Sequence, residues 1–387
     1  MRVAHIITRM ILGGAQENTL YTCLDLMRLY GDDVLLVTGP ETGPEGSLLE
    51  RAKEQGVPLA ILPALQRAIH PVRDLESYRA IKRVLREFRP DVVHTHSAKG
   101  GILGRMAADA LKVKAIVHTV HGAPFYPYQS KGARTFYRWC ERYAAQRCHA
   151  LVSVADAMTE LMVNAGVAPR EKFTTIYSGM EVEPFLAADE RRAATRRELG
   201  FTDDQVVIGK IARLFYLKGH EYVIRAAAPV IARYPNVRFL FVGDGLLRTS
   251  LERQIAEAGL SSFFYFAGLV PPERIPSLVG AMDVLVHTSL REGLARALPQ
   301  ALIAGKPVVS YDIDGAREVV LPGETGYLLP PQSIEPLSHA LGELAADAEL
   351  RRRLGGQGRG RFADLFRHET MTRQLRDLYQ RLLEANA

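Results

Sequence analysis

The sequence predicts a two-domain α/β protein in which each domain is built around a parallel β-sheet. Three observations lead to this prediction. Short apolar runs alternate with helical stretches along the chain, as in strand–helix–strand units with parallel strands. Most of these runs are continuously apolar, which is typical of strands covered on both faces. At 387 residues, the chain is also too long for one ordinary hydrophobic core.

The expected elements follow the chain in order. The first half shows strand-length runs at residues 3–7, 34–38, 59–62, 91–95, 115–120, 150–154 and 174–176, with helices such as 15–29 and 75–88 between them. After a charged break at 187–200 the pattern restarts, with strands at 206–212, 238–242, 264–267, 284–288, 307–310 and 327–329 and helices at 220–233 and 247–258. We therefore predict domains over 1–185 and 186–365. A C-terminal helix follows over 366–387. The polar helical pattern itself runs over about 360–385, and this helix could pack on either domain.

Composition and charge narrow the class of protein. The chain is 47% hydrophobic and 24% charged, which is typical of a soluble globular protein. Its three cysteines lack CxxC spacing, and no secretory leader or apolar run of membrane-spanning length is present, so we expect reduced thiols and a cytoplasmic location. Residues 66–147 carry 16 Lys/Arg against 6 Asp/Glu, a net charge of +10, which leaves −4 for the remainder. Such a field attracts phosphates, acidic lipid headgroups or nucleic acid.

Ligands of open parallel sheets bind at the carboxyl ends of strands, so candidate site residues are sought there. Gly13-Gly14 follows the first strand, where it either lets the backbone approach a ligand or simply makes a tight turn. His94 and His96 end a later strand, and we expect alternation to send them to opposite faces, which argues against a shared metal. Ser97 and Lys99 then open a helix as a candidate acceptor- or phosphate-facing edge.

Further polar residues follow other strands. His121 enters a Pro/aromatic loop, where it can donate to a substrate hydroxyl or phosphate, or cap the loop's own backbone. Arg213 and Lys218 follow the first strand of the second half and offer two cations to a departing diphosphate, although a solvated pair is the alternative. Glu292 precedes Gln300 by eight residues, and we expect both on one side of a helix that begins at Glu292. Asp314-Gly315 is expected to begin the next helix in the same way.

The order of these motifs resembles the retaining glycosyltransferases of family 4, of GT-B fold. The resemblance covers nearly the whole chain: the Gly-Gly loop, HG after a strand, RLxxxKG, VGDG, EG…AxxAGxPVV, DGxxE and GETGYLL. It implies two Rossmann-like domains with parallel sheets that face each other across a cleft, the first binding the acceptor and the second the donor nucleotide. It also implies a sugar-nucleotide donor, net retention at the anomeric carbon and no metal or other cofactor.

The resemblance assigns roles to individual residues. His121, Arg213, Lys218 and Glu292 would be catalytic, with His121 on the donor sugar, the two cations on the diphosphate and Glu292 on the sugar hydroxyls. Donor-binding positions would be Gly13, Gly14, Asp244, Val270, Gly293, Leu294 and Gln300, and Ser97 and Lys99 would bind the acceptor. The family usually has a second Glu where this chain has Gln300. We expect this difference to alter donor affinity without abolishing the chemistry.

The expected partners are a UDP- or GDP-sugar donor and a lipid-linked or oligosaccharide acceptor, in cell-envelope polysaccharide synthesis. Residues 126–147 join basic and aromatic side chains: Arg134, Arg138 and Arg142 recur every four residues, beside a stripe of Phe136, Trp139, Cys140 and Tyr143. Such a helix either lies on an anionic membrane surface or packs against the core with its arginine face exposed to solvent. With the family resemblance and the +10 region, we expect peripheral attachment to the inner face of the plasma membrane.

Four other classes fit less well. A sugar-nucleotide epimerase shares the architecture, and a donor-binding pseudoenzyme is favoured only by Gln300. A nucleic-acid-binding protein would explain the basic region, but no helix-turn-helix, RNA-binding or zinc motif accompanies it, so no nucleic-acid partner is expected. A pyridoxal-dependent phosphorylase would be longer, and phosphate binding explains Lys218 better.

Overall fold

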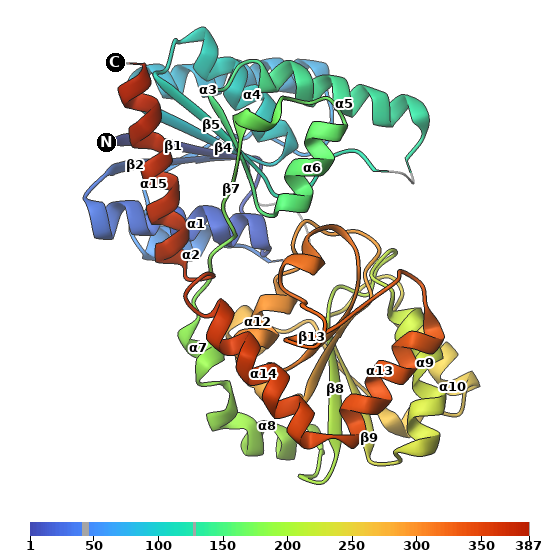
Figure 1. Cartoon of the computed structure of the whole chain (residues 1–387). Helices are drawn as coiled ribbons and strands as arrows, with labels where there is room; N and C mark the ends of the chain where they lie inside the picture. Colours follow the sequence, from blue (N-terminus) through green and yellow to red (C-terminus); the bar gives the residue numbers. More distant parts are fainter. Residues whose placement is uncertain (41–45, 127–128, 387) are drawn as a thin grey trace. The chain divides into compact units, whose positions relative to one another are not determined.

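The computed structural model describes residues 1–40, 46–126 and 129–386, which form two compact units. The first unit combines Met1–Met180 with Leu365–Ala387, and the second unit contains Glu181–Asp364 (Figure 1). The chain therefore leaves the first unit at Met180, where residue 185 was expected, and returns to it at Leu365. The C-terminal segment belongs to the first unit.

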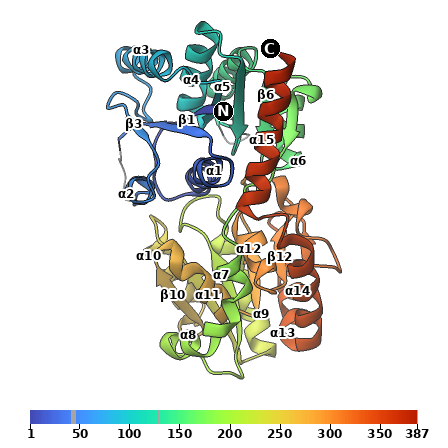
Figure 2. The ribbon, with the colours of Figure 1, turned by 90° about the vertical axis from the view of Figure 1, so that its left-hand side faces the viewer.

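A seven-stranded parallel sheet forms the centre of the first unit. Its strands lie in the order β3-β2-β1-β4-β5-β6-β7. Their bounds are β1 Arg2–Ile7, β2 Asp33–Thr38, β3 Leu59–Ile61, β4 Val92–His96, β5 Ala115–Val120, β6 Ala150–Ser153 and β7 Phe173–Thr175. The helices are α1 Gly14–Tyr30, α2 Leu49–Glu54, α3 Pro71–Phe88, α4 Ala98–Ala110, α5 Lys131–Ala145, α6 Asp156–Asn164 and α15 His368–Ala385. Every residue of β4 and β5 is buried, because helices cover both faces of the sheet (Figure 2).

The last helix, α15, completes the core of the first unit. It packs along α1 (Figure 2). Its apolar side chains join those of the sheet and of α1 in one core cluster. The buried residues that it contributes are Met371, Leu375, Leu378 and Tyr379. Its entry is fixed where the N–H of Met180 donates to the carbonyl of Phe366 at 2.8 Å. The expected helix at about 360–385 is wrong in its start: α14 ends at Phe362, and the chain crosses back to the first unit before α15 begins.

The second unit has a six-stranded parallel sheet in the order β10-β9-β8-β11-β12-β13. Its strands are β8 Val206–Ile211, β9 Val237–Val242, β10 Phe264–Gly268, β11 Val284–His287, β12 Val308–Tyr311 and β13 Gly326–Leu329. The helices are α7 Glu183–Leu186, α8 Arg192–Leu199, α9 His220–Arg233, α10 Arg248–Glu257, α11 Ile275–Ala281, α12 Ala297–Ile303, α13 Ile334–Ala346 and α14 Ala348–Phe362. Four short 3₁₀ helices complete the described elements of this unit, among them η5 Asp314–Glu318.

The prediction of two parallel-sheet α/β domains is confirmed. All the expected strands are present, with ends that differ from the expected ones by at most one residue. Among the described residues, none of the helices combines the length and the apolar composition that a membrane crossing needs.

Candidate functional site

Sheet topology locates one candidate region in each unit. Where the strand order reverses, the loops after two neighbouring strands run in opposite directions and leave an opening at the carboxyl edge. This reversal lies between β1 and β4 in the first unit and between β8 and β11 in the second. The loops concerned carry Gly13-Gly14 and Ser97 in the first unit, and Lys218 and Glu292 in the second.

Lys218 and Glu292 form the centre of the region in the second unit. Lys218 Nζ donates to Glu292 Oε1, and the two side chains are only 22% and 19% exposed. The backbone N–H of Glu292 donates to Asp314 Oδ2 at 2.6 Å, and the N–H of Gly315 donates to the carbonyl of Gly293 at 3.0 Å. The loops after β8, β11 and β12 therefore meet at Glu292, which lies 74 residues from Lys218 along the chain.

Unusual backbone conformations shape these loops. Leu217 (φ 65°) and Asp314 (φ 44°) adopt the left-handed region, which costs a non-glycine residue about 1 kcal/mol or more. Gly219 (φ 71°) opens α9 beside them, and a Cβ there would meet the carbonyl oxygen of Thr288 at 2.0 Å. Only glycine fits this approach of the β8 and β11 loops. Strained backbone of this kind is typical of functional sites.

Below the Lys218–Glu292 pair lies a buried polar layer that the sequence analysis missed. Lys210, in β8, is fully buried and donates to Thr288 Oγ1 at 3.1 Å, and that hydroxyl donates to the carbonyl of Gly219 at 2.6 Å. Burial lowers the pKa of Lys210 to about 7. His287 Nε2 lies 3.7 Å from Glu292 Oε1, and burial lowers the pKa of this histidine well below its usual range. The single lysine within the apolar run 206–211 was the available signal.

One expectation about Glu292 is wrong. Glu292 and Gly293 do not begin a helix: α12 starts at Ala297, so Glu292 and Gln300 do not share one. Pro299 explains the difference, because proline is tolerated in the first turn of a helix but breaks its interior. Gln300 is half-buried in the first turn of α12, while Gly293 and Leu294 lie in the loop before it. Asp314 begins a 3₁₀ helix, η5.

The remaining predicted residues of the second unit lie in loops at the same sheet edge. Arg213 is exposed in the loop after β8, with its Cζ 5.9 Å from the centre of the Phe215 ring. Asp244 is exposed after β9, and its Oδ1 accepts from the N–H of Gly245 at 2.7 Å. Val270 is half-buried just after β10. These loops also expose Phe215, Tyr216, Leu246 and Leu269.

In the first unit, the two residues predicted to bind the acceptor substrate, Ser97 and Lys99, both form hydrogen bonds to other residues of the protein. The Ser97 hydroxyl lies 2.7 Å from that of Thr8 and accepts from the Thr8 N–H at 3.2 Å, which joins the ends of β1 and β4. Lys99 Nζ lies 2.5 Å from Asp74 Oδ1, so its charge is used to join α4 to α3. Gly13 precedes the first residue of α1, Gly14, and its carbonyl accepts from the N–H of Glu17 at 3.0 Å.

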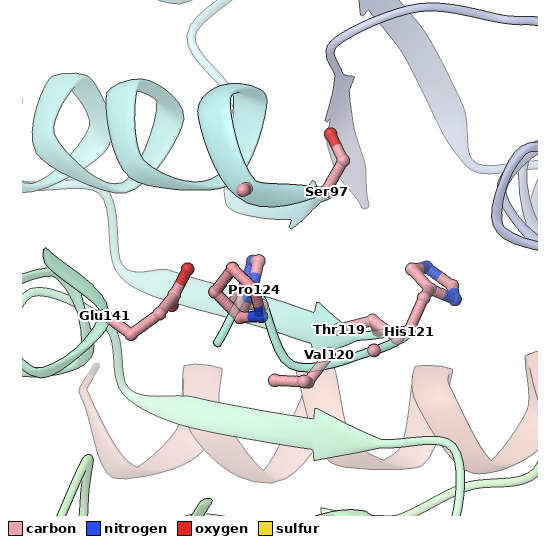
Figure 3. Close-up of a pocket in the computed structure, with 9 residues that line it drawn as sticks. Ser97, Thr119, Val120, His121, Pro124 and Glu141 are labelled. Atoms are coloured by element: carbon pink, nitrogen blue, oxygen red, sulfur yellow. The ribbon is translucent and has the colours of Figure 1, made fainter. Parts of the chain in front are cut away.

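His121 follows β5 and lines a small pocket within the first unit. Figure 3 shows His121 and Ser97 toward one end of this pocket and Glu141 toward the other. His121 Nε2 lies 3.1 Å from His96 Nδ1, so its ring is held from the sheet side. Glu141 pairs with Arg105 at 2.9 Å, and both side chains are almost fully buried.

The expectation that His94 and His96 point to opposite faces is wrong. Their ring centres are 4.3 Å apart, because residues two apart in a strand share a face. The nitrogens of His5, His94 and His96 lie within 4.8 Å of one another, a grouping that could hold a metal ion. Both nitrogens of His94 have other partners, however: Nδ1 lies 2.5 Å from the Tyr379 hydroxyl and Nε2 lies 2.7 Å from Thr119 Oγ1. His94 is thus a buried histidine with both nitrogens satisfied, a role expected for one of the pair.

The basic and aromatic helix α5 leaves two aromatic side chains in solvent. Phe136 and Trp139 are 49% and 60% exposed, so this part of the stripe is not buried in the core. Arg134 and Arg142 are also exposed, whereas Arg138 donates to the carbonyl of Ala165 at 2.7 Å. Residues 127 and 128, at the start of the basic and aromatic segment, lie outside the described residues.

Two family models match the chain one after the other. The model described as a glycosyl transferase 4-like domain matches residues 13–179, and the model described as glycosyl transferases group 1 matches residues 191–361. The first match lies within the first unit and the second lies within the second unit.

Relatives of known name cover most of the chain. The chain is 29% identical over 353 residues to the UDP-Gal:alpha-D-GlcNAc-diphosphoundecaprenol alpha-1,3-galactosyltransferase of Escherichia coli, a match that spans 90% of this chain and 89% of that protein. It is 23% identical to the capsular polysaccharide biosynthesis glycosyltransferase CapM of Staphylococcus aureus, over 83% of this chain and 84% of that protein.

Solved structures share the fold. Anabaena Alr3699/HepE, crystallised with UDP, superposes with a TM-score of 0.83 at 21% identity, over 98% of this chain and all of that one. Sucrose-phosphate synthase from Thermosynechococcus elongatus superposes with a TM-score of 0.78 at 20% identity, over the full length of both chains.

Proposed function

Because the chain belongs to family 4 of the glycosyltransferases and has the GT-B fold, we propose that it transfers a hexose or N-acetylhexosamine from a nucleotide-diphosphate sugar, with retention at the anomeric carbon. The acceptor that we propose is a lipid-linked or oligosaccharide precursor of a cell-envelope polysaccharide. The relatives named for undecaprenol-linked galactosyl transfer and for capsule synthesis support this class of acceptor.

One observation carries the proposal: Lys218 and Glu292 meet at the strand-order reversal of the second unit, in loops held by Asp314 and Gly219. A lysine ammonium has three N–H donors, so Lys218 can keep its contact with Glu292 and still reach a phosphate oxygen. Glu292 accepts hydrogen bonds from sugar hydroxyls, while the loop at Gly293 and Leu294 offers backbone N–H groups. The pair can therefore hold a hexose beside the phosphate to which it is attached.

The proposed reaction breaks the bond between the anomeric carbon and the diphosphate oxygen and forms a bond to the acceptor oxygen on the same face. The acceptor proton passes to the departing diphosphate. Negative charge grows on that diphosphate as the bond breaks, so cations aimed at it stabilise the transition state more than the ground state. We assign this role to Lys218 and Arg213, and we propose that the reaction needs no metal ion.

A donor screen followed by a transfer assay tests the proposal. UDP-, GDP- and ADP-sugars are compared by their shifts in thermal unfolding, and the strongest binder is then incubated with polyprenyl-diphosphate-sugar and oligosaccharide acceptors. We expect a UDP-sugar to bind best, in keeping with the UDP-galactose relative and the UDP-bound structural neighbour. Donor binding with neither transfer nor slow donor hydrolysis would contradict the proposal, and an epimerised sugar from donor alone would indicate an epimerase.

We also propose that α5 attaches the protein to an anionic membrane surface on the cytoplasmic side. The exposed Phe136 and Trp139 can enter the headgroup region, while Arg134 and Arg142 attract acidic lipids. Flotation with phosphatidylglycerol vesicles tests this, and we expect replacement of Arg134, Arg142 and Trp139 to abolish it. Arg138 is left intact because it joins α5 to the backbone at Ala165. Equal flotation of wild type with neutral vesicles would contradict the electrostatic part.

A further inference from the structure

A row of three histidines crosses the sheet of the first unit and ends at the candidate pocket. His5 Nδ1 lies 3.0 Å from His96 Nε2, and His96 Nδ1 lies 3.1 Å from His121 Nε2. The three residues come from β1, from the end of β4 and from the loop after β5, so the row runs across neighbouring strands. His5 and His96 are fully buried, and His121 is half-exposed at the pocket.

The ring geometry is that of in-plane N–H···N hydrogen bonds. The ring centres of His5 and His96 are 5.3 Å apart with an 18° angle between the planes, and those of His96 and His121 are 5.4 Å apart with a 28° angle. The bonded nitrogens thus lie near the line that joins the ring centres, where the lone pair of one ring faces the N–H of the other. The contact between His94 and His96 differs: its 4.3 Å centre separation leaves no room for such a bond.

Each of these rings must be neutral if the hydrogen bonds along the row are all to run in the same direction. Burial lowers the pKa of His5 to about 3 and lowers that of His96 well below its usual range. A neutral imidazole carries one N–H and one lone pair, so the choice made at His5 determines the choice at His96 and then at His121. The hydrogen bonds can therefore run in one of two directions, with each ring donating toward His121 or each ring donating toward His5.

The far nitrogen of His5 selects between these directions. His5 Nε2 is buried and has no hydrogen-bond partner among the described residues. A buried N–H without an acceptor is rarer in proteins than an acceptor with an unused lone pair. The proton of His5 therefore resides on Nδ1 and is donated to His96 Nε2, which leaves the His96 proton on Nδ1 to be donated to His121 Nε2.

We propose that His5 and His96 are positioning residues that hold His121 in the tautomer with its proton on Nδ1. His121 then presents an N–H, and not a lone pair, to an oxygen of the substrate. The consequence for the reaction rests on the proposed glycosyl transfer, whereas the tautomer itself is a property of the first unit that can be measured without substrate. The role of His121 is thus set by residues that do not touch the substrate.

Nitrogen-15 NMR of histidine-labelled full-length protein tests the proposal directly. Long-range proton–nitrogen correlations distinguish the two tautomers, and single His→Gln variants assign the three resonances. We expect His5, His96 and His121 all to carry the proton on Nδ1, which is the minor form of a neutral histidine side chain in water. A proton on Nε2 of any of the three would overturn the proposal.

Variants at His96 supply the second test. In His96→Leu the ring of His121 loses its inner donor, so we expect its proton to move to Nε2 and kcat/KM to fall by about tenfold, the effect of one hydrogen bond. His96→Asn keeps an amide N–H near the Nδ1 position and should recover both the tautomer and most of the activity. Retention of the Nδ1 tautomer in His96→Leu would overturn the proposal.

Tyr379→Phe is the matched control for a purely structural effect. It removes the hydroxyl that lies against His94 Nδ1, in the same cluster but outside the row. We expect it to lower the unfolding temperature while the His121 tautomer and kcat/KM remain at wild-type values. If no nucleotide sugar is a donor for the wild type, the proposed function fails, and the tautomer measurement still decides on the row.

Discussion

Lys218 is the residue on which the proposed chemistry depends most directly. Lys218→Ala removes a cation from the departing diphosphate, so we expect kcat/KM to fall by about 100-fold or more. Steady-state transfer assays measure this effect. Lys53→Ala is the matched control, because Lys53 also pairs with a glutamate, Glu50, but at an exposed surface site, and it should leave turnover unchanged. Wild-type turnover in Lys218→Ala would contradict the assignment.

Gln300 is the position where this chain departs from the family pattern. Its neutral amide can accept from a ribose hydroxyl, but a carboxylate forms hydrogen bonds about twice as strong. We therefore expect Gln300→Glu to lower the KM for the donor by about fivefold with little change in kcat. Donor titration of both enzymes under saturating acceptor gives the answer. A large fall in kcat would show that this side chain contributes to the chemical step.

Lys210 makes stability depend on pH in a defined window. Its folded pKa of about 7 lies below its ordinary value of 10.5, so between these values the unfolded chain binds more protons. The cost of burying the charged lysine is therefore full below pH 7 and declines as pH rises toward 10.5. We expect wild type to gain about 2 kcal/mol of unfolding free energy relative to Lys210→Met between pH 7 and pH 9.

Urea unfolding of the two proteins at several pH values measures this difference. Lys53→Met, at an exposed lysine, supplies the comparison for changes that affect all lysines alike. A difference between wild type and Lys210→Met that does not change with pH would show that Lys210 stays charged in the folded protein over this range, as it does in the unfolded chain.

Helices α4 and α5 are joined by a buried ion pair whose partners cannot be removed singly at low cost. Arg105 and Glu141 side chains are 0% and 3% exposed. Arg105→Leu leaves a buried carboxylate unpaired, and we expect it to lower the unfolding free energy by about 3 kcal/mol. Adding Glu141→Leu should recover most of this loss. A double variant no more stable than the single one would show that the arginine acts through packing and not through its charge.

The chain path makes the first unit depend on the C-terminal segment. Deletion of residues 365–387 uncovers Met371, Leu375, Leu378 and Tyr379, and burial of each is worth about 2 kcal/mol, so the sum approaches the whole stability of a domain. We expect residues 1–180 alone not to fold, as judged by circular dichroism and thermal unfolding. Residues 1–180 joined to 365–387 by a short linker should fold, because Met180 already bonds to Phe366. Cooperative unfolding of 1–180 alone would contradict this.

Much of the architecture could be predicted from local pattern. The apolar runs of β6 and β11 predict that these strands are buried on both faces, as the structure shows, and the restart after residue 200 predicts a second sheet. Open parallel sheets bind ligands in the loops at strand ends, and this rule predicts Lys218 and Glu292 as candidate site residues. The expectation that His94 and His96 point to opposite faces was wrong on local grounds alone, because side chains two residues apart in a strand lie on the same face.

Local pattern predicts these elements because the spacing of apolar side chains along a strand or a helix shows which of its faces is buried. Partnerships between distant residues are not recorded in this way. Glu292 meets Lys218 across 74 positions and Tyr379 meets His94 across 285, and each depends on how whole elements pack. The same packing joins His5, His96 and His121 into one row and places α15 on the first unit, because a hydrogen bond forms only where the folded backbone brings its donor and acceptor together.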